Sequence, residues 1–358
     1  MLNIRENCKY GIAAPTSMGV RITPPGGAPV HTSNTYIMQA TSAESNAINI
    51  SSSLGIKGLV LTNFVKDSPI SFFIKSELSR RNIDYIGPDI PQGSPWGYRH
   101  QFNIADSGFG TRGPRVHNDR AGEVGRVLNA DHFDFEKIFG EDGVQILHLS
   151  GLVGAISPDT TRFCINAMHA AKKHGTLISF DMNHRASFWK GRADELRANF
   201  IKMVSMTDIL IGNEEDYQLC LGIEGPKVGD SDVSAQIEGF MEMVSRIKDA
   251  YPNAIVFGNT LREVISVSEH MWGAISLFDD AWTVIEPRPI QILDRIGGGD
   301  GFAGGLLYGI LTGMEPEKTT QFAWATGALA TTVLDDYATP IDEDMVWSIY
   351  HGNARVKR

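Results

Sequence analysis

The residues with the clearest chemical potential lie in one run, DRIGGGDGFAGGLLYGIL, at positions 294–311. Gly297, Gly298 and Gly299 precede a helical pattern of apolar residues, and Asp300 falls in its first turn. A glycine turn that opens a helix directs several unpaired backbone N–H groups at one point, with the positive end of the helix dipole behind them. We therefore expect an anion hole with the Asp300 carboxylate beside it. In phosphoryl transfer, such groups neutralise charge on the phosphoryl oxygens and accept the proton of the attacking hydroxyl.

Other interpretations of this run stay open at this point. Taken alone, the glycines also suit a tight turn, with Asp300 as a simple helix cap. A Walker A loop is excluded because no GK[ST] follows the glycines. A nicotinamide oxidoreductase is disfavoured because no GxGxxG opens an amino-terminal βαβ unit.

Three further segments place polar residues at the ends of predicted strands, namely DMNHRASFW (181–189), GNEEDY (212–217) and GNTLRE (258–263). Open α/β sheets bind ligands beyond the carboxyl ends of their strands, so these segments favour a site at one sheet edge. Arg185 in the first segment suits a carboxylate or a phosphate through its planar guanidinium. The acids of the second segment either bind Mg²⁺ through water or only complement a helix dipole.

The chain that must position these residues alternates apolar strands with helical segments from about Gly143 onward. This alternation predicts a mostly parallel sheet covered by helices on both faces. The expected strands are 58–65, 144–151, 177–183, 208–213 and 254–260, and the expected helices include 45–55, 71–81, 159–174 and 193–204. Two segments interrupt the rhythm, at about 16–34 and 96–120. We expect them to form a small lid outside the main sheet, although irregular surface loops are nearly as consistent with their composition.

Composition narrows the possible partners. The 358 residues carry a formal net charge of -10, which argues against a general binder of nucleic acid or of anionic membranes. Three widely spaced cysteines suit reduced thiols, and neither a signal peptide nor an apolar run of membrane-spanning length is apparent. We therefore expect a cytoplasmic protein whose partner is a small molecule.

Together, these segments resemble the signatures of the PfkB, or ribokinase-like, carbohydrate kinases. The run beginning at Asp294 is similar to the family's carboxyl-terminal signature, and the three strand-end segments follow the family's order. RITPPG (21–26) and SAESNAINISSSLG (42–55) are similar to its early strand and its first substrate-binding helix. The combination most resembles the branch that phosphorylates 2-keto-3-deoxygluconate, and it covers nearly the whole chain.

The resemblance implies a single ribokinase-like domain over residues 1–358, built as a three-layer α/β/α sandwich with a small β-sheet lid. It also implies ATP and Mg²⁺ as cofactors, and a homodimer joined through the lid. By position, it makes Asp300 the catalytic base and Gly297, Gly298 and Gly299 the anion hole. It assigns the sugar side to Ser42, Asn46, Arg99, Asn118, Arg120, Arg185 and Asp336. It assigns the nucleotide side to Asn213, Asp216, Thr260 and Arg262, with Asp216 also influencing the metal.

The chain departs from the family pattern mainly on the sugar side. Thr41 and Ser42 stand where the family usually has two glycines, so we expect a smaller or reshaped pocket. Thr16–Ser17 replaces a glycine followed by an acid, and Arg99 and Asn118 replace lid tyrosines. The phosphoryl-transfer half is intact by comparison.

The resulting hypothesis is an ATP-dependent kinase for 2-keto-3-deoxygluconate or a related keto-sugar acid. One alternative is a kinase of the same family for a neutral ketose or a nucleoside. The retained Arg120 and Arg185 favour an acid, because a neutral sugar gives no reason to keep two guanidiniums. The other alternative is a sugar-sensing relative without catalysis, which the altered sugar-side motifs motivate.

Overall fold

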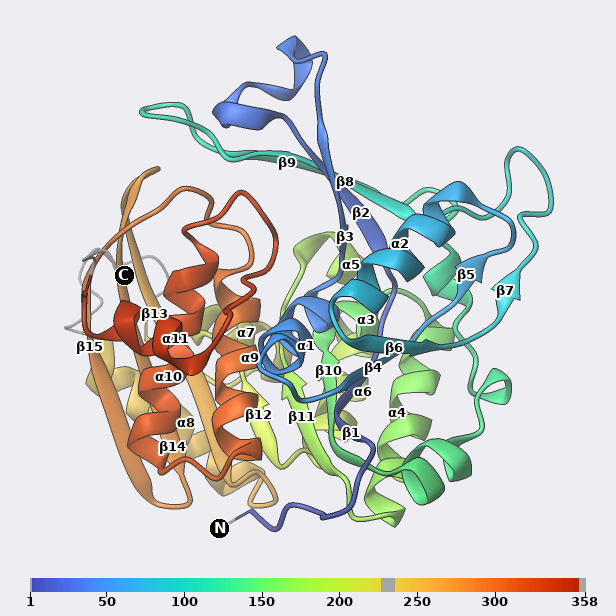
Figure 1. Ribbon diagram of the computed structural model, residues 1–358. Coiled ribbons are helices and arrows are strands. Elements are labelled where there is room, and N and C mark those ends of the chain that lie inside the picture. The colour runs from blue at the N-terminus through green and yellow to red at the C-terminus, as the bar shows by residue number, and fades with distance from the viewer. Residues whose placement is uncertain (1, 227–235, 354–358) are drawn as a thin grey trace.

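Figure 1 shows the computed structural model, whose described residues are 2–226 and 236–353. In these residues, nine strands form one large sheet. Their order across the sheet is β15 (Ala281–Gln291), β14 (Glu269–Phe278), β13 (Val256–Ser266), β12 (Ile209–Ile211), β11 (Leu177–Asp181), β10 (Val144–Ser150), β1 (Tyr10–Pro15), β4 (Gly58–Leu61) and β6 (Ile83–Ile86).

The strands from β13 to β6 all pair in parallel, and β14 and β15 add antiparallel strands at one edge. Parallel neighbours need crossover connections, which the helices between them provide. The prediction of a mostly parallel sheet is confirmed. The expected strand 254–260 is too short, since β13 continues to Ser266, and the expected strand 58–65 is β4 followed by the separate β5 (Phe64–Val65).

Two hydrophobic clusters cover the two faces of this sheet. Adjacent residues of one strand enter different clusters, as Ile146 and Leu147 do in β10, because successive side chains of a strand point to opposite faces. One cluster holds α3 (Gly151–Ala155), α4 (Pro158–Lys173), α5 (Ala186–Trp189), α6 (Ala193–Val204), α7 (Glu214–Leu221) and α8 (Ile237–Ala250). The other holds α1 (Ala43–Ser53), α2 (Pro69–Arg80), α9 (Gly298–Leu311), α10 (Pro316–Ala330) and α11 (Glu343–Tyr350). The expected three-layer α/β/α sandwich is therefore confirmed.

A second, four-stranded sheet stands over the carboxyl edge of the large one (Figure 1). Its order is β3 (Ile37–Thr41), β2 (Gly19–Thr23), β8 (Gln101–Asp106) and β9 (Arg115–Asp119). Three of these strands fall in the two segments expected to leave the main sheet, whereas β3 lies beyond residue 34. The remaining short elements are β7 (Asp89–Ile90), which pairs with β5, and η1 (Pro25–Gly27), η2 (Val30–Thr32), η3 (Val124–Val127), η4 (Ala130–His132) and η5 (Glu136–Gly143).

No helix within residues 2–226 and 236–353 is both long enough and apolar enough to cross a membrane.

The aromatic packing between β11 and α6 gives a test of the core. Phe180 is fully buried, and its ring meets Phe200 edge-on at a centroid distance of 5.4 Å. Phe180→Ala should lower the free energy of unfolding by about 3–5 kcal/mol, because a large side chain leaves a cavity in a packed interior. Phe72→Ala, at a side chain that is 61% exposed on α2, should change it by less than about 0.5 kcal/mol. Urea denaturation of both variants measures this, and equal losses would contradict the assigned core.

Candidate active site

One large cavity, of about 1090 Å³, opens between the small sheet and the carboxyl ends of the large sheet. Its wall includes all of the expected site residues except Arg99. They are Ser42, Asn46, Asn118, Arg120, Arg185, Asn213, Asp216, Thr260, Arg262, Gly297, Gly298, Gly299, Asp300 and Asp336. The fold thus gathers residues from distant parts of the chain around one space, while the role of each stays a prediction.

The start of α9 forms one wall of the cavity. Gly297 has a φ of 87°, in the left-handed region that favours glycine, and an added Cβ would lie 2.1 Å from the carbonyl oxygen of Asp336. The first internal hydrogen bond of the helix is Gly301 N–H to Gly297 O, at 2.8 Å. Within the described chain, no side chain caps this helix start. The N–H groups of the first turn therefore remain available to an anion.

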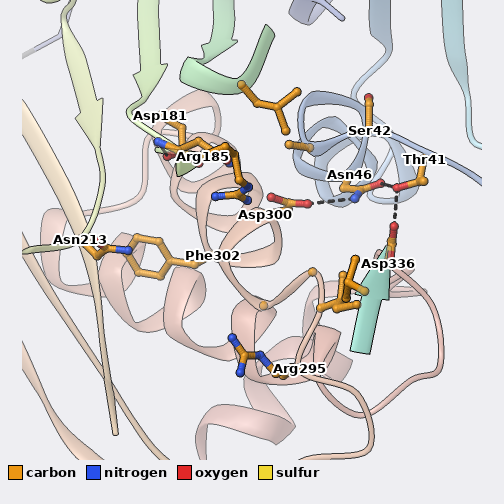
Figure 2. A pocket seen from close by; sticks show the side chains of 18 of the residues that line it. Thr41, Ser42, Asn46, Asp181, Arg185, Asn213, Arg295, Asp300, Phe302 and Asp336 are labelled. Carbon is orange, nitrogen blue, oxygen red and sulfur yellow. Dashed lines mark hydrogen bonds between the residues drawn. The ribbon is translucent and has the colours of Figure 1, made fainter. Parts of the chain in front are cut away.

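Asp300 lies in that first turn and faces α1 across the cavity. Asn46 Nδ2 donates to Asp300 Oδ2 at 2.9 Å, and the guanidinium of Arg185 points toward the same carboxylate (Figure 2). The residue keeps some solvent contact through the cavity, but the protein packed around it raises its pKa to about 7. Desolvation is the main cause; the Asn46 hydrogen bond and Arg185 oppose it, whereas the nearby Asp336 and Glu44 add to it. A carboxylate with such a pKa can both accept and release a proton near neutral pH.

Two more acids line the cavity beside Asp300. Burial, followed by the charges of Asp216 and Asp300, raises the pKa of Asp181 to about 8, and Arg185 opposes the shift. Burial also raises the pKa of Asp216. Its carboxylate accepts the N–H of His184 at 2.8 Å and the N–H of Asn213 at 3.1 Å, so both oxygens already have backbone partners. Residues 2–226 and 236–353 contain no cluster of three or more His, Cys, Asp or Glu that could hold a metal ion.

Positive charge gathers at the other end of the cavity. Arg262 and Arg295 both line it, and neither forms an ion pair with any described residue. Arg262 stays accessible to solvent, yet desolvation by the surrounding protein and then the charge of Arg295 lower its pKa, while Glu214 opposes this. Burial and then the same two arginines lower the pKa of His270 to about 4. Unpaired guanidiniums this close together suit an anion. Our sequence reasoning missed Arg295, although it lies in the same run as the glycines.

The small sheet contributes amide side chains that the sequence reasoning also missed. Gln101 Nε2 donates to the carbonyl oxygen of Ser17 at 3.3 Å, while Gln101 Oε1 is buried and has no partner among the described residues. Oδ1 of Asn103 is also buried and without a partner among the described residues. Asn103 lies opposite Asn118 in the pairing of β8 with β9. Residues 101 and 103 alternate along β8 and so share the face toward the cavity. Gln101 and Asn103 are polar residues two positions apart in this strand, and that spacing could have predicted that they share one face.

Arg99 does not line the cavity. Its guanidinium pairs with Asp119 and its Nε donates to the carbonyl oxygen of Ala121 at 2.7 Å, so its charge is used within the small sheet. This placement argues against contact between Arg99 and the substrate, and the expected contact stays a prediction. Arg120 does line the cavity, where Nη1 donates to Glu123 at 2.5 Å and the guanidinium lies 5.2 Å from the ring centre of Phe188.

Comparison with known proteins places this arrangement in a family. The model of the pfkB family of carbohydrate kinases matches residues 126–342, more than half of the chain. The chain belongs to this family.

Individual relatives of this pfkB protein are distant. A 5-dehydro-2-deoxygluconokinase of Clostridium perfringens is 26% identical over 211 residues, 59% of this chain and 55% of that protein, so the match spans about half of the relative's length. A 2-dehydro-3-deoxygluconokinase of Thermoproteus tenax is 26% identical over 273 residues, 76% of this chain and 73% of that protein. The crystal structure of a 2-dehydro-3-deoxygluconokinase from Thermotoga maritima superposes with a TM-score of 0.84 at 24% identity, covering 96% of this chain and 100% of that one. The last comparison shows a shared fold.

The sequence departures occupy defined places in the pfkB fold. Thr41 Oγ1 donates to Asp336 Oδ2 at 2.7 Å (Figure 2). Ser42 Oγ caps α1 by accepting the N–H of Ser45 at 3.1 Å. Both side chains are therefore held by the protein in the cavity wall. Ser17 Oγ donates to Glu123 Oε1 at 2.5 Å, so a neighbouring segment brings a carboxylate to the position where the resemblance leads us to expect an acid.

Two glycines of the predicted anion hole should respond differently to a methyl group. Gly297→Ala should lower the free energy of unfolding by at least about 1 kcal/mol, because it forces a positive φ on alanine and a clash with Asp336 O. An added Cβ on Gly299 meets nothing within 4 Å, so Gly299→Ala should unfold like the parent. Its methyl group stands in the cavity wall and should weaken ATP binding. Urea denaturation and ATP titration calorimetry test the pair; full ATP affinity in Gly299→Ala would contradict the anion hole.

The raised pKa of Asp300 predicts a pH dependence of turnover. A base acts only when ionised, so kcat/KM, which reports the pKa of the free enzyme, should fall about tenfold per pH unit below about pH 7 and level off above it. Asn46→Ala removes a hydrogen bond that lowers this pKa, so the acid limb should move to higher pH. Steady-state rates from pH 5 to 9 measure both profiles. An acid limb that stays in place in Asn46→Ala would argue against Asp300 as the titrating group.

Proposed function

We propose that this pfkB protein transfers the γ-phosphoryl group of ATP to a hydroxyl of a small sugar acid, 2-keto-3-deoxygluconate or a related keto-sugar acid. The observation that carries the proposal is the pairing of the Asp300 carboxylate with an uncapped helix start, in a cavity that also holds unpaired guanidiniums. The names of the two relatives, each a kinase of a keto-deoxy sugar acid, support the same substrate class.

Arg185 is the group that would recognise the substrate carboxylate. It lines the cavity, donates to the neighbouring carbonyl of His184 at 2.9 Å, and forms no ion pair with any described acid. Arg120 is already paired with Glu123, so its charge is partly neutralised. The buried acceptors of Gln101 and Asn103 would receive hydrogen bonds from substrate hydroxyls. This division favours an acid with hydroxyls over a neutral ketose or a nucleoside, which remains the alternative.

The phosphates of ATP fit the opposite end of the cavity. The N–H groups of the first turn of α9 would hold the transferring phosphoryl group, and Arg262 and Arg295 would face the leaving phosphates. Asn213 and Thr260 line the same side and would contact the nucleotide. Mg²⁺ would arrive with the phosphates, neutralise part of their charge, and meet Asp216 through water, since both oxygens of Asp216 accept backbone hydrogen bonds.

In the proposed reaction, Asp300 takes the proton from the substrate hydroxyl while the oxygen of that hydroxyl forms a bond to the γ-phosphorus of ATP. The bond from that phosphorus to the bridging β-phosphate oxygen breaks, and ADP leaves with the electron pair. Asn46 holds the Asp300 carboxylate in place by its hydrogen bond. Protonated Asp300 then loses its proton to solvent, which a pKa of about 7 permits.

We further propose that residues 1–358 act as one domain, with segments 16–34 and 96–120 as a lid over the sugar. Exposed apolar side chains on the small sheet, Ile37, Met38 and Val116, support a homodimer joined there, which sedimentation velocity would test. Use of ATP suits a cytoplasmic protein.

Turnover on a substrate panel tests the proposal. ADP release with ATP and Mg²⁺ should be confined to 2-keto-3-deoxygluconate and related keto-sugar acids, and Arg185→Gln should raise KM for the acids. Asp300→Asn should lower kcat by about 10²–10⁴-fold through loss of the base. Asp194→Asn, an exposed acid in the first turn of α6, is the matched control and should keep full activity.

Turnover only with neutral sugars would overturn the substrate class while keeping the kinase. Sugar binding in a thermal-shift assay without any ATP turnover would instead favour the non-catalytic sensor.

A further inference from the structure

The most deeply buried charge in the small sheet belongs to Arg21, in the middle of β2. Its side chain has no solvent exposure, and it does not line the cavity. The guanidinium binds the carboxylates of Asp294 and Asp336 through its two Nη atoms, and its Nε donates to Thr23 Oγ1 at 2.6 Å. Burial would lower the pKa of Arg21, and the two carboxylates more than reverse that effect. A buried charge of this kind requires partners in fixed positions.

The first partner, Asp294, opens the anion-hole segment. Its Oδ1 accepts the N–H of Ile296 at 3.0 Å, which ties the carboxylate to the backbone just before the three glycines. Its Oδ2 accepts the hydroxyl of Ser107, immediately after β8, at 2.9 Å. Asp294 therefore joins the small sheet to the approach of the phosphate-binding turn.

The second partner, Asp336, packs against the turn itself. Its carbonyl oxygen occupies the space where a Cβ of Gly297 would stand. Its Oδ2 accepts the hydroxyl of Thr41 in β3 at 2.7 Å, and its N–H donates to Gln39 Oε1 in the same strand at 3.3 Å. Strands β2, β3 and the end of β8 thus all reach the two segments that enclose the anion hole, and Arg21 connects both.

We propose that Arg21 is a positioning residue that fixes the backbone of residues 294–299 for phosphate and so links the small sheet to the anion hole. One buried guanidinium would then fix the position of a sugar on the small sheet relative to a phosphate at the start of α9. The inference rests on the proposed kinase function for its kinetic consequences, but its structural part does not. Lysine keeps the charge and cannot reproduce the planar fork that reaches two carboxylates, so Arg21→Lys isolates the geometry.

The test compares the full chain with Arg21→Lys and with Arg112→Lys. Arg112 also pairs with an aspartate of the small sheet, Asp106. Its other side-chain partner among the described residues is the carbonyl of Gly27, away from the anion hole, so it is the matched control. Amide hydrogen exchange without ligand should be about tenfold faster in a peptide spanning 292–301 of Arg21→Lys, and unchanged in β10 and β11. The Arg112→Lys protein should match the parent in all three segments.

Kinetics supply the second readout. Arg21→Lys should raise the Kd for ATP in calorimetry and lower kcat by about 10²-fold, the loss expected when donors to a developing charge are misplaced. The KM for the sugar acid should rise by a smaller factor than the Kd for ATP, because Arg21 reaches the sugar side only through Asp336, whereas Asn46, Asn118 and Arg185 do not contact it. A purely structural role would reduce stability and leave the kinetic constants of the folded fraction intact.

The outcomes are separable. Normal exchange in 292–301, with normal ATP affinity, in a folded Arg21→Lys protein would overturn the inference. If that variant does not fold, Ser107→Ala, which removes only one bond to Asp294, should shift exchange and ATP affinity in the same direction by a smaller factor, and no shift would overturn the inference. A parent without turnover on any sugar would sink the proposed function, while exchange and ATP binding would still decide the role of Arg21.

Discussion

Helix α9 begins with backbone N–H groups that no side chain of the described chain caps, and the rest of the site is arranged around that unsatisfied end. Each such group needs a hydrogen-bond partner, and leaving it without one costs free energy in a partly desolvated place. The left-handed turn at Gly297, pressed against the carbonyl of Asp336, fixes where these groups point. Asp300 follows in the same turn, so the position of the carboxylate and the direction of the amides come from a single piece of backbone. Under the proposed function, this one piece of backbone would align phosphate binding with proton acceptance.

The charged side chains of the cavity, like the N–H groups at the start of α9, lack some of the partners that would neutralise them. Burial is the main cause that raises the pKa values of Asp181, Asp216 and Asp300, and nearby acids add to each shift, whereas burial and nearby guanidiniums lower the pKa values of Arg262 and His270. Like charges held together destabilise the folded chain, and a site can tolerate this only because the two packed faces of the large sheet are stable enough to hold it. Under the proposed function, an anionic substrate and the phosphates of ATP would relieve the charge repulsion at opposite ends of the cavity. The folded chain would then be more stable with the cavity occupied than with it empty.

Local pattern was enough to locate much of this architecture. The helix at Ala193–Val204 was predicted to the residue, since its apolar spacing and flanking polar residues are both clear. The strand-end segments were found because a buried parallel strand is a short apolar run that stops abruptly at polar residues. By contrast, β13 continues past its predicted end as a largely exposed hairpin strand without a clear apolar run. Strand β3 was missed because its first two residues are exposed and it pairs with β2 in the small sheet, outside the main alternation of strands and helices. Residue type alone did not predict that Gln101, and not Arg99, faces the cavity. The pairing of strands and side chains within the small sheet decides this.

Long-range partnerships were beyond any local pattern. Arg21 lies 273 and 315 residues from its two carboxylate partners, and nothing near RITPPG marks it as charged and fully buried. The exchange at Ser17 and Glu123 is similar. In the sequence, Ser17 stands where the family has an acid, which suggested an altered pocket. In the fold, the carboxylate of Glu123, 106 residues away, accepts a hydrogen bond from Ser17 and also pairs with Arg120. A site of this kind is defined by which charges meet in space. Its chemistry can therefore persist while the segments that supply each charge change, and the departures on the sugar side are compatible with an acid-recognising pocket.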